Sequence, residues 1–116
     1  MRMLRGLILL GVLAALSACT VWPVGEDPYS LKARRGANQV IEAIQTYRQK
    51  TGAFPSSLGV LVPAYLPALP EGPALQYNSN DGSLAYHYIP SWPQLQWVWC
   101  NSVGDTTEWR CTKKMT

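Results

Sequence analysis

Residues 31–50 read LKARRGANQVIEAIQTYRQK, and within them small and apolar side chains recur at steps of three and four. That spacing is the period of one face of an α-helix. The recurring residues are Ala33, Ala37, Val40, Ile41, Ile44 and Tyr47. We predict an amphipathic helix that starts near Leu31, with Asp27 or Ser30 as its N-cap and Gly52 as its C-terminal cap. Gly36 costs such a helix about 1 kcal/mol relative to alanine, so it requires a reason, either close packing or a later helix start.

Serines and prolines dominate the segment that follows this helix. Ser56 and Ser57 can cap a short helical turn that reaches Val62 and ends before Pro63. Prolines at positions 63, 67, 70 and 73 then force an extended path. We therefore expect a loop without regular structure before the next element.

Four short segments in the second half of the chain alternate in the period-two manner of β-strands. They span about residues 75–77, 84–89, 95–100 and 107–112. The turn Asn78-Ser79-Asn80-Asp81-Gly82 joins the first two as a hairpin. The predicted fold class is α+β, with one long N-terminal helix packed on a small antiparallel sheet of about four strands. The strand order after Pro90 remains open at this point.

The order of motifs from the helix to the first strand resembles the type IV pilin and type II secretion pseudopilin family. The matching stretches are Val40–Tyr47, Gly52-Ala53-Phe54-Pro55, Ser57-Leu58, Leu61-Val62-Pro63, Tyr65-Leu66, Leu69-Pro70 and Tyr77, within residues 37–90. In that family a helix ending in tyrosine is followed by a Gly-x-aromatic-Pro turn and an antiparallel sheet. The resemblance implies a pilin-like domain over residues 30–116. Because pilins pack into filaments through a long apolar helix that this chain does not match, we expect an accessory protein, not a filament subunit.

The N-terminal residues have the order of a secretory signal. Arg2 and Arg5 precede an apolar run over residues 6–15, and small residues follow. The run is shorter than the roughly 20 residues that a membrane-spanning helix needs. We therefore predict a cleavable signal peptide over residues 1–18.

Leu16-Ser17-Ala18-Cys19 resembles the lipobox of bacterial lipoproteins, in which a diacylglycerol is attached to the cysteine before cleavage. The resemblance implies a lipid on Cys19 that anchors the chain to a membrane, followed by a tether over residues 19–29. Thr20, where the inner-membrane pattern has Asp, implies sorting to the outer membrane. The alternative is an ordinary signal peptide with a cysteine beside its cleavage site.

Cys100 and Cys111 are the two remaining cysteines once Cys19 carries lipid. An even count in an oxidising compartment predicts a disulfide, and closing a loop of about a dozen residues stabilises a fold by roughly 2–3 kcal/mol. A metal-binding pair is the alternative, but the only other soft ligand is His87 and no CxxC or HxxxH spacing occurs. The late acidic residues, Asp105 and Glu108, are too few for a calcium site. We expect neither a metal nor a cofactor.

Charge and motif content argue against several functions. Without residues 1–18 the chain has eight basic and seven acidic side chains, a formal net charge of +1, which indicates no nucleic-acid partner. No nucleophile elbow occurs, the carboxylates are scattered, and the single His87 lies within a predicted strand, so we expect no enzyme. Two basic pairs, Arg34-Arg35 and Lys113-Lys114, could touch anionic lipid or remain solvated.

Aromatic residues in the predicted sheet indicate a binding function, because five tryptophans exceed what so small a core usually buries. The candidates for a partner-binding face are Tyr86, Tyr88, Trp92, Trp97, Trp99 and Trp109, and packing between sheet and helix is the alternative reading. Trp22 is separate, because it lies near the lipid and could sit at the membrane interface.

With the two resemblances, these residues predict a non-enzymatic lipoprotein on the periplasmic face of the outer membrane. It would bind a protein partner in a type IV pilus or type II secretion-like assembly. The competing hypothesis is a lipoprotein inhibitor or sensor that binds an envelope enzyme or a cell-wall ligand.

Overall fold

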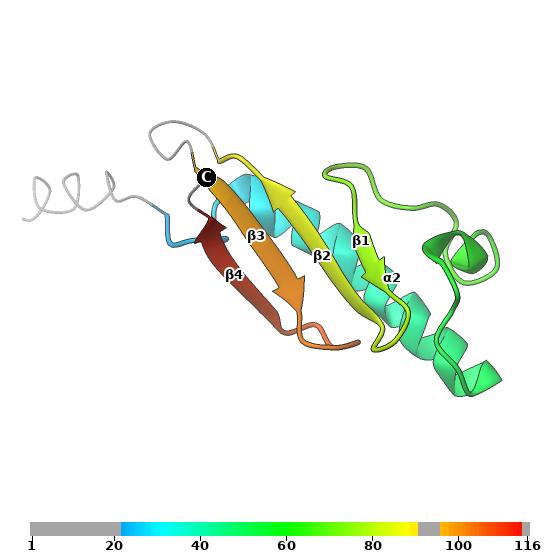
Figure 1. Ribbon diagram of the computed structural model, residues 1–116. Coiled ribbons are helices and arrows are strands. Elements are labelled where there is room, and N and C mark those ends of the chain that lie inside the picture. Colours follow the sequence, from blue (N-terminus) through cyan, green and yellow to red (C-terminus); the bar gives the residue numbers. More distant parts are fainter. Residues whose placement is uncertain (1–21, 91–95, 115–116) are drawn as a thin grey trace, which may run out of the picture.

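A single α-helix lies along one face of a four-stranded antiparallel sheet in the computed structural model, which describes residues 22–90 and 96–114 (Figure 1). The predicted α+β fold class is confirmed. The elements are α2 (Pro28–Thr51), the 3₁₀ helix η1 (Leu58–Leu61), β1 (Gln76–Asn78), β2 (Ser83–Tyr88), β3 (Trp97–Ser102) and β4 (Trp109–Lys114). The predicted signal peptide, Cys19 and Trp92 lie outside the described residues.

The helix α2 begins at Pro28, three residues before the predicted start. Asp27 is the N-cap, and its Oδ2 accepts a hydrogen bond from the Ser30 backbone N–H at 3.1 Å. Proline suits the first helical position because it has no N–H to leave unpaired and its φ is already helical. Ser30 is therefore not the cap; its side chain is buried and lies 2.7 Å from the Tyr86 hydroxyl.

The predicted C-terminal cap of α2 is confirmed. Gly52 adopts a left-handed conformation with φ of 79°, and its N–H donates to the Arg48 carbonyl at 2.8 Å. Glycine takes this conformation without the steric cost that a Cβ would bring.

The buried face of α2 matches the predicted spacing. Its fully buried apolar residues are Ala37, Val40, Ile41 and Ile44. Gly36 is explained by close packing, since a Cβ placed there would lie 2.8 Å from Cβ of Pro70. The helix and the proline-rich loop approach each other at a distance that only glycine permits.

The loop between α2 and the sheet completes the core. Ser57 precedes η1 but makes no side-chain capping bond. Leu61 and Leu66 are buried against the helix, and the Tyr77 hydroxyl donates to the Pro55 carbonyl at 2.7 Å. No helix or strand lies between η1 and β1, as the prolines predict.

The sheet is a simple meander in the order β1-β2-β3-β4. This order resolves the strand arrangement left open after Pro90. Gly82, at φ 73°, closes the predicted hairpin by donating its N–H to the Asn78 carbonyl at 2.8 Å. The strand β4 starts at Trp109, two residues later than predicted. The turn before it extends to Glu108, whose carbonyl accepts a hydrogen bond from the Val103 N–H.

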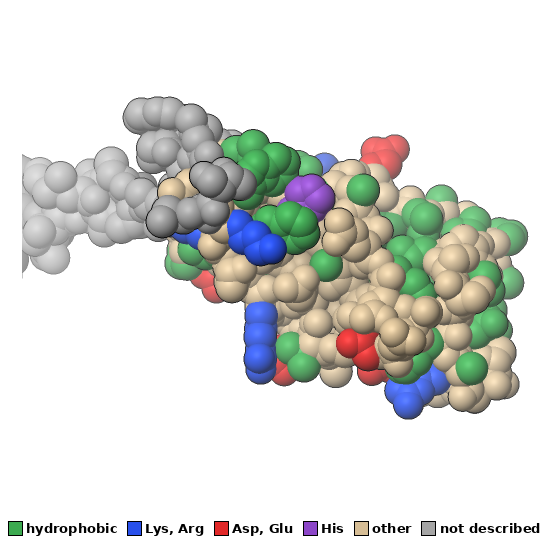
Figure 2. Space-filling view, in the orientation of Figure 1, with side chains coloured by type: hydrophobic (Ala, Val, Ile, Leu, Met, Phe, Trp, Pro, Cys, Tyr) green, Lys and Arg blue, Asp and Glu red, His purple; other side chains and the backbone are tan. Residues whose placement is uncertain are grey.

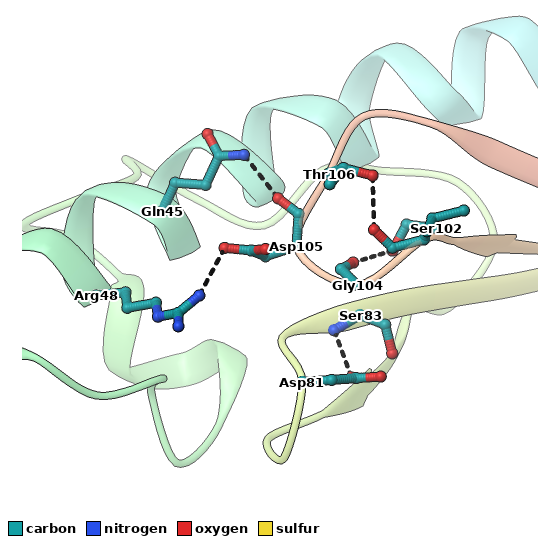
Figure 3. A network of polar contacts seen from close by, with 9 residues as sticks. Gln45, Arg48, Asp81, Ser83, Ser102, Gly104, Asp105 and Thr106 are labelled. Carbon is teal, nitrogen blue, oxygen red and sulfur yellow. Dashed lines mark hydrogen bonds and ion pairs between the residues drawn. The ribbon is translucent and has the colours of Figure 1, made fainter.

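The turn between β3 and β4 is fastened to the helix (Figure 3). Gln45 donates from Nε2 to the Asp105 carbonyl at 2.6 Å, and Arg48 lies 3.5 Å from the Asp105 carboxylate. Ser102, from the end of β3, donates to the Gly104 carbonyl at 2.9 Å. These bonds hold the far end of the sheet on the C-terminal half of α2.

Cys100 and Cys111 form the predicted disulfide, with an S–S distance of 2.00 Å. The two residues are direct partners in the β3–β4 ladder. Arg34 donates to the Gly25 carbonyl at 2.9 Å and lies 3.3 Å from the Cys111 sulfur. The chain before α2, the helix and the last strand therefore meet at one point.

Candidate partner-binding face

The sheet has one side covered by α2 and one side, here called the open face, that no described element covers (Figure 1). The pairing register places alternate residues of β2, β3 and β4 on the open face. They are Ser83, Ala85, His87, Trp97, Trp99, Asn101, Arg110, Thr112 and Lys114. These strand positions carry two basic groups and no carboxylate.

An aromatic and basic cluster occupies the end of the open face where β3 begins. The His87 ring stacks on Trp99, with centroids 4.4 Å apart and planes 21° apart, and lies 5.1 Å from the Trp97 ring. Lys114 Nζ lies 4.6 Å from the Trp99 centroid. Figure 2 shows the histidine among hydrophobic side chains, with basic side chains beside them. We call His87, Trp97, Trp99 and Lys114 the open-face cluster.

The register explains why these four side chains meet. His87 is the direct partner of Trp99 across β2 and β3, and Trp97 is the direct partner of Lys114 across β3 and β4. Side chains at directly opposed positions of an antiparallel pair lie close enough to interact, and diagonal neighbours with long side chains also reach each other. A cation above an indole ring is attracted to its negative face.

The open-face cluster has groups that a partner could bind. Trp97 keeps 36% of its surface exposed, so its indole can pack against an apolar or planar group. Nδ1 of His87 is buried and makes no hydrogen bond within the described part of the chain. Buried polar atoms normally have a partner, so an incoming group could add a hydrogen bond to this nitrogen only if the ring or its neighbours moved to expose it.

A groove of about 480 Å³ lies beside the open-face cluster. It is lined by Tyr29, Pro73, Ala74, His87, Tyr88, Ile89, Pro90 and Trp97. The groove joins the open face to the start of α2. Its lining is mostly aromatic, proline or aliphatic, which suits a partner that presents an apolar side chain or loop.

Of the six aromatic residues predicted as one binding face, the five that the structure describes do not share one face. Trp97 and Trp99 lie on the open face, but Tyr86 and Tyr88 are buried on the helix side, and Trp109 is half-buried there. Trp109 donates from Nε1 to the Asn38 side chain at 2.7 Å. These three residues therefore pack between the sheet and the helix, which was the alternative to a binding face.

Tyr88 links the end of β2 to the start of α2. Its hydroxyl donates to the Asp27 carboxylate, which also caps α2. Burial, followed by the hydrogen bond to Asp27, raises the pKa of the Tyr88 hydroxyl well above its usual range. The raised pKa favours the neutral phenol, the form that donates to Asp27 in this contact.

Two members of the open-face cluster were not named among the predicted binding residues. His87 was placed within a predicted strand without a binding role, and Lys114 lay beyond the predicted end of the fourth strand. The extension of β4 to Lys114 brings the lysine opposite Trp97. A longer alternating pattern, Trp109, Cys111 and Lys113 against Arg110, Thr112 and Lys114, is the signal that could have shown this.

Residues 22–90 and 96–114 contain no group of three or more histidine, cysteine or acidic side chains that is arranged to hold a metal ion. No helix within the same ranges combines the length and the apolar character needed to cross a bilayer. The ring contacts of His87 in this part of the chain are to Trp97 and Trp99.

Comparisons with protein-family models, curated proteins and solved structures found no match for this chain. The fold and the site define a small α+β domain whose sheet presents an aromatic and basic open face. Its function is therefore argued from its own residues.

Proposed function

We propose that this protein is a lipid-anchored, non-enzymatic binding module of the cell envelope, an accessory of a type IV pilus or type II secretion-like assembly. The observation that carries the proposal is the open face, where Trp97, His87 and Lys114 are left uncovered on a domain that has a complete core on its other side. A sheet face that carries two tryptophans yet contributes nothing to the core has the composition of a protein interface.

The resemblance to pilins and pseudopilins supports the choice of assembly. The matching motifs of residues 37–90 correspond to a helix, a capped turn at Gly52, a proline-rich loop and a hairpin, in that order. Fold alone is a weak warrant for function. The motif order therefore identifies the kind of assembly to test, and the open face identifies the surface.

The lipobox-like Leu16-Ser17-Ala18-Cys19 supports the anchor. Two or more acyl chains at about 0.8 kcal/mol per buried methylene hold a small domain stably on a bilayer. We place the anchor in the outer membrane, because Thr20 follows the cysteine, and we assign it to the periplasmic face. In this arrangement the membrane and a protein are the two partners of the chain.

A photo-cross-linking amino acid at Asn101 tests the proposed interface in intact cells. Asn101 is exposed on the open face, two positions from Trp99. We expect it to capture a pilus or secretion component, and we expect the adduct to be lost when Trp97→Thr is added. The matched control is the same probe at Gln49, an exposed position on α2, which should give no such adduct. Capture of the same component at both positions would contradict an interface on the open face.

A second candidate function, an envelope inhibitor or sensor, is favoured by the groove between Tyr29 and Trp97. Such a groove could accept a loop of an enzyme or a cell-wall fragment. The same experiment separates the two functions. An adduct of Asn101 with an envelope enzyme or with cell-wall material, and with no filament or secretion component, would replace the accessory function by this one.

A further inference from the structure

We infer that the end of the molecule where α2 begins rests against the bilayer surface, through four exposed side chains at Trp22, Tyr29, Leu31 and Ile89. We call these four residues the apolar rim. The inference rests on the lipid anchor of the proposed function, because it uses Cys19 as the point of attachment. It adds a defined orientation of the domain relative to the membrane.

The topology gathers the rim at one end of the molecule. Figure 1 shows that α2 and β3 begin, and β2 and β4 end, at the same end as residue 22. Tyr29 and Ile89 come from α2 and from the residue after β2, and both line the groove that also contains Trp97. Segments that are far apart in the sequence therefore contribute to one surface.

The distance to the anchor is short. Trp22 lies three positions after Cys19. Whatever the conformation of the chain, three positions span at most roughly 10 Å. A lipid on Cys19 therefore keeps this end close to the headgroups, whereas the opposite end, where η1 lies, is kept away by the length of α2 (Figure 1).

The exposed side chains of this end are of the kinds that membranes accept. Trp22 is 58% exposed, Tyr29 49%, Ile89 48% and Leu31 40%. Tryptophan and tyrosine are enriched at membrane interfaces because their rings are apolar and their polar atoms stay in contact with water. In an isolated domain these side chains would remain in water, but beside a bilayer they are buried at its interface.

Basic side chains complement an anionic leaflet at the same end. Lys113 and Lys114 are exposed at the end of β4. Lys32 is exposed on the first turn of α2, next to Glu71, and Glu26 is a further exposed carboxylate near the helix start. At this end of the molecule the excess of positive charge therefore lies at the end of β4. Lysines close to a membrane are attracted to anionic lipids, so Lys113 and Lys114 favour an anionic leaflet.

This orientation has a consequence for the open face. The strands run between the rim end and the far end of the molecule (Figure 1). When the rim rests on the bilayer, the strands point away from it and the open face looks sideways, along the membrane. A neighbouring protein in the same membrane can then reach Trp99 and Asn101 without displacing lipid.

The test uses the purified full-length lipidated protein in vesicles of phosphatidylethanolamine and phosphatidylglycerol. Part of the phosphatidylglycerol carries a photoactivatable group in its acyl chain, and lipid adducts are mapped by mass spectrometry. We expect adducts at Tyr29, Leu31 and Ile89 and none at Val60, which is 41% exposed but belongs to η1 at the far end. Ile89→Ser should remove most of the adducts at Tyr29, whereas the matched control Val60→Ser should leave them unchanged.

The outcomes separate the anchor from the orientation. Protein that does not float with the vesicles, and whose Cys19 carries no diacylglycerol, would overturn both proposals. Protein that floats but gives adducts only near Trp22, or equal adducts at Val60, would overturn the orientation and leave the anchor intact. Vesicles in which photoactivatable phosphatidylcholine replaces the photoactivatable phosphatidylglycerol, and which contain no anionic lipid, should give fewer adducts. Equal yields would overturn the contribution of Lys113 and Lys114.

Discussion

The two faces of the sheet are made by the same strands, yet they differ in almost every physical respect. On the helix side of β2, Leu84, Tyr86 and Tyr88 are buried against α2. On the open face of the same strand, Ala85 and His87 remain partly exposed. Neighbours in sequence therefore belong to different environments, one that stabilises the fold and one that is available for binding. A shift of register by one residue would exchange the two sets.

Tyr86→Ala should show the largest effect, on the helix side. Tyr86 is fully buried, its hydroxyl lies 2.7 Å from Ser30 Oγ, and its ring contacts Trp109. Truncation of a large buried aromatic costs about 3–5 kcal/mol. Urea unfolding followed by tryptophan fluorescence measures it, and Tyr86→Phe, at about 1 kcal/mol, serves if the alanine variant does not fold. A cost for His87→Thr as large as that of Tyr86→Ala would remove the distinction between the faces.

Removal of the disulfide should have the next largest effect. The double substitution Cys100→Ala and Cys111→Ala opens a loop with a sequence separation of 11 residues. The entropy of the unfolded chain then rises, and the free energy of unfolding should fall by about 3 kcal/mol. The midpoint of urea unfolding, compared with and without reductant for the unsubstituted protein, checks the value. A midpoint that reductant leaves unchanged would contradict a stabilising cross-link.

Tyr88→Phe should destabilise the protein by about 1–2 kcal/mol at neutral pH, because the Asp27 carboxylate loses a donor in a half-buried position. The pKa of Tyr88 is raised in the folded state above its ordinary value of 10.0. The neutral phenol is therefore the form that folding favours. Its contribution is complete below pH 10 and declines as the pH rises above that value.

The pH dependence supplies a second measurement of the same contact. Unfolding free energies measured between pH 8 and pH 11 should fall less steeply in Tyr88→Phe than in the unsubstituted protein. Equal slopes would mean that the hydroxyl does not discriminate between its two protonation states.

Gly36→Ala should destabilise the protein slightly, by about 1 kcal/mol, although alanine is the better helix former. The new Cβ would lie 2.8 Å from Cβ of Pro70, so the loop must move. In a Pro70→Gly background the same change should become neutral or stabilising. Thermal unfolding of the four variants gives the coupling, and additive effects would show that the two residues do not meet.

Trp97→Thr should have the smallest effect on stability, below about 1 kcal/mol, because its side chain lies on the open face and is 36% exposed. Circular dichroism and the urea midpoint should stay close to those of the unsubstituted protein. Capture of the partner through Asn101 should nevertheless be lost. A large loss of stability would place Trp97 with the core residues and not with the binding surface.

The sequence predicted the elements better than their faces. Steps of three and four identified Ile41 and Ile44 as the buried side of the helix, and the alternation of residues 84–88 identified β2. In the first four residues of β3, however, both alternating sets are apolar or cysteine. Period-two spacing separates Trp97 and Trp99 from Val98 and Cys100, but it does not show which pair faces the helix.

Tertiary contacts decided the remaining points. Cys100 pairs with the buried Tyr86, so Val98 and Cys100 face the helix and the larger tryptophans face outward. The reason for Gly36 lies in Pro70, which is 34 positions away and visible only in the fold. From the sequence, Asp27 and Ser30 are equal candidates for the helix cap. In the fold the Ser30 hydroxyl contacts Tyr86, and the Asp27 carboxylate accepts the capping hydrogen bond.

The junction of Gly25, Arg34 and Cys111 also has a mechanical meaning. Under the proposed lipid anchor and partner, the domain would be loaded at its N-terminal end whenever the partner moved. Tension entering at Trp22 passes first to Gly25, whose carbonyl is held by Arg34 and which packs against Cys111. The covalent bond from Cys111 to Cys100 then shares the load between β3 and β4. The structure is thus reinforced where a pulling force would otherwise begin to peel the last strand from the sheet.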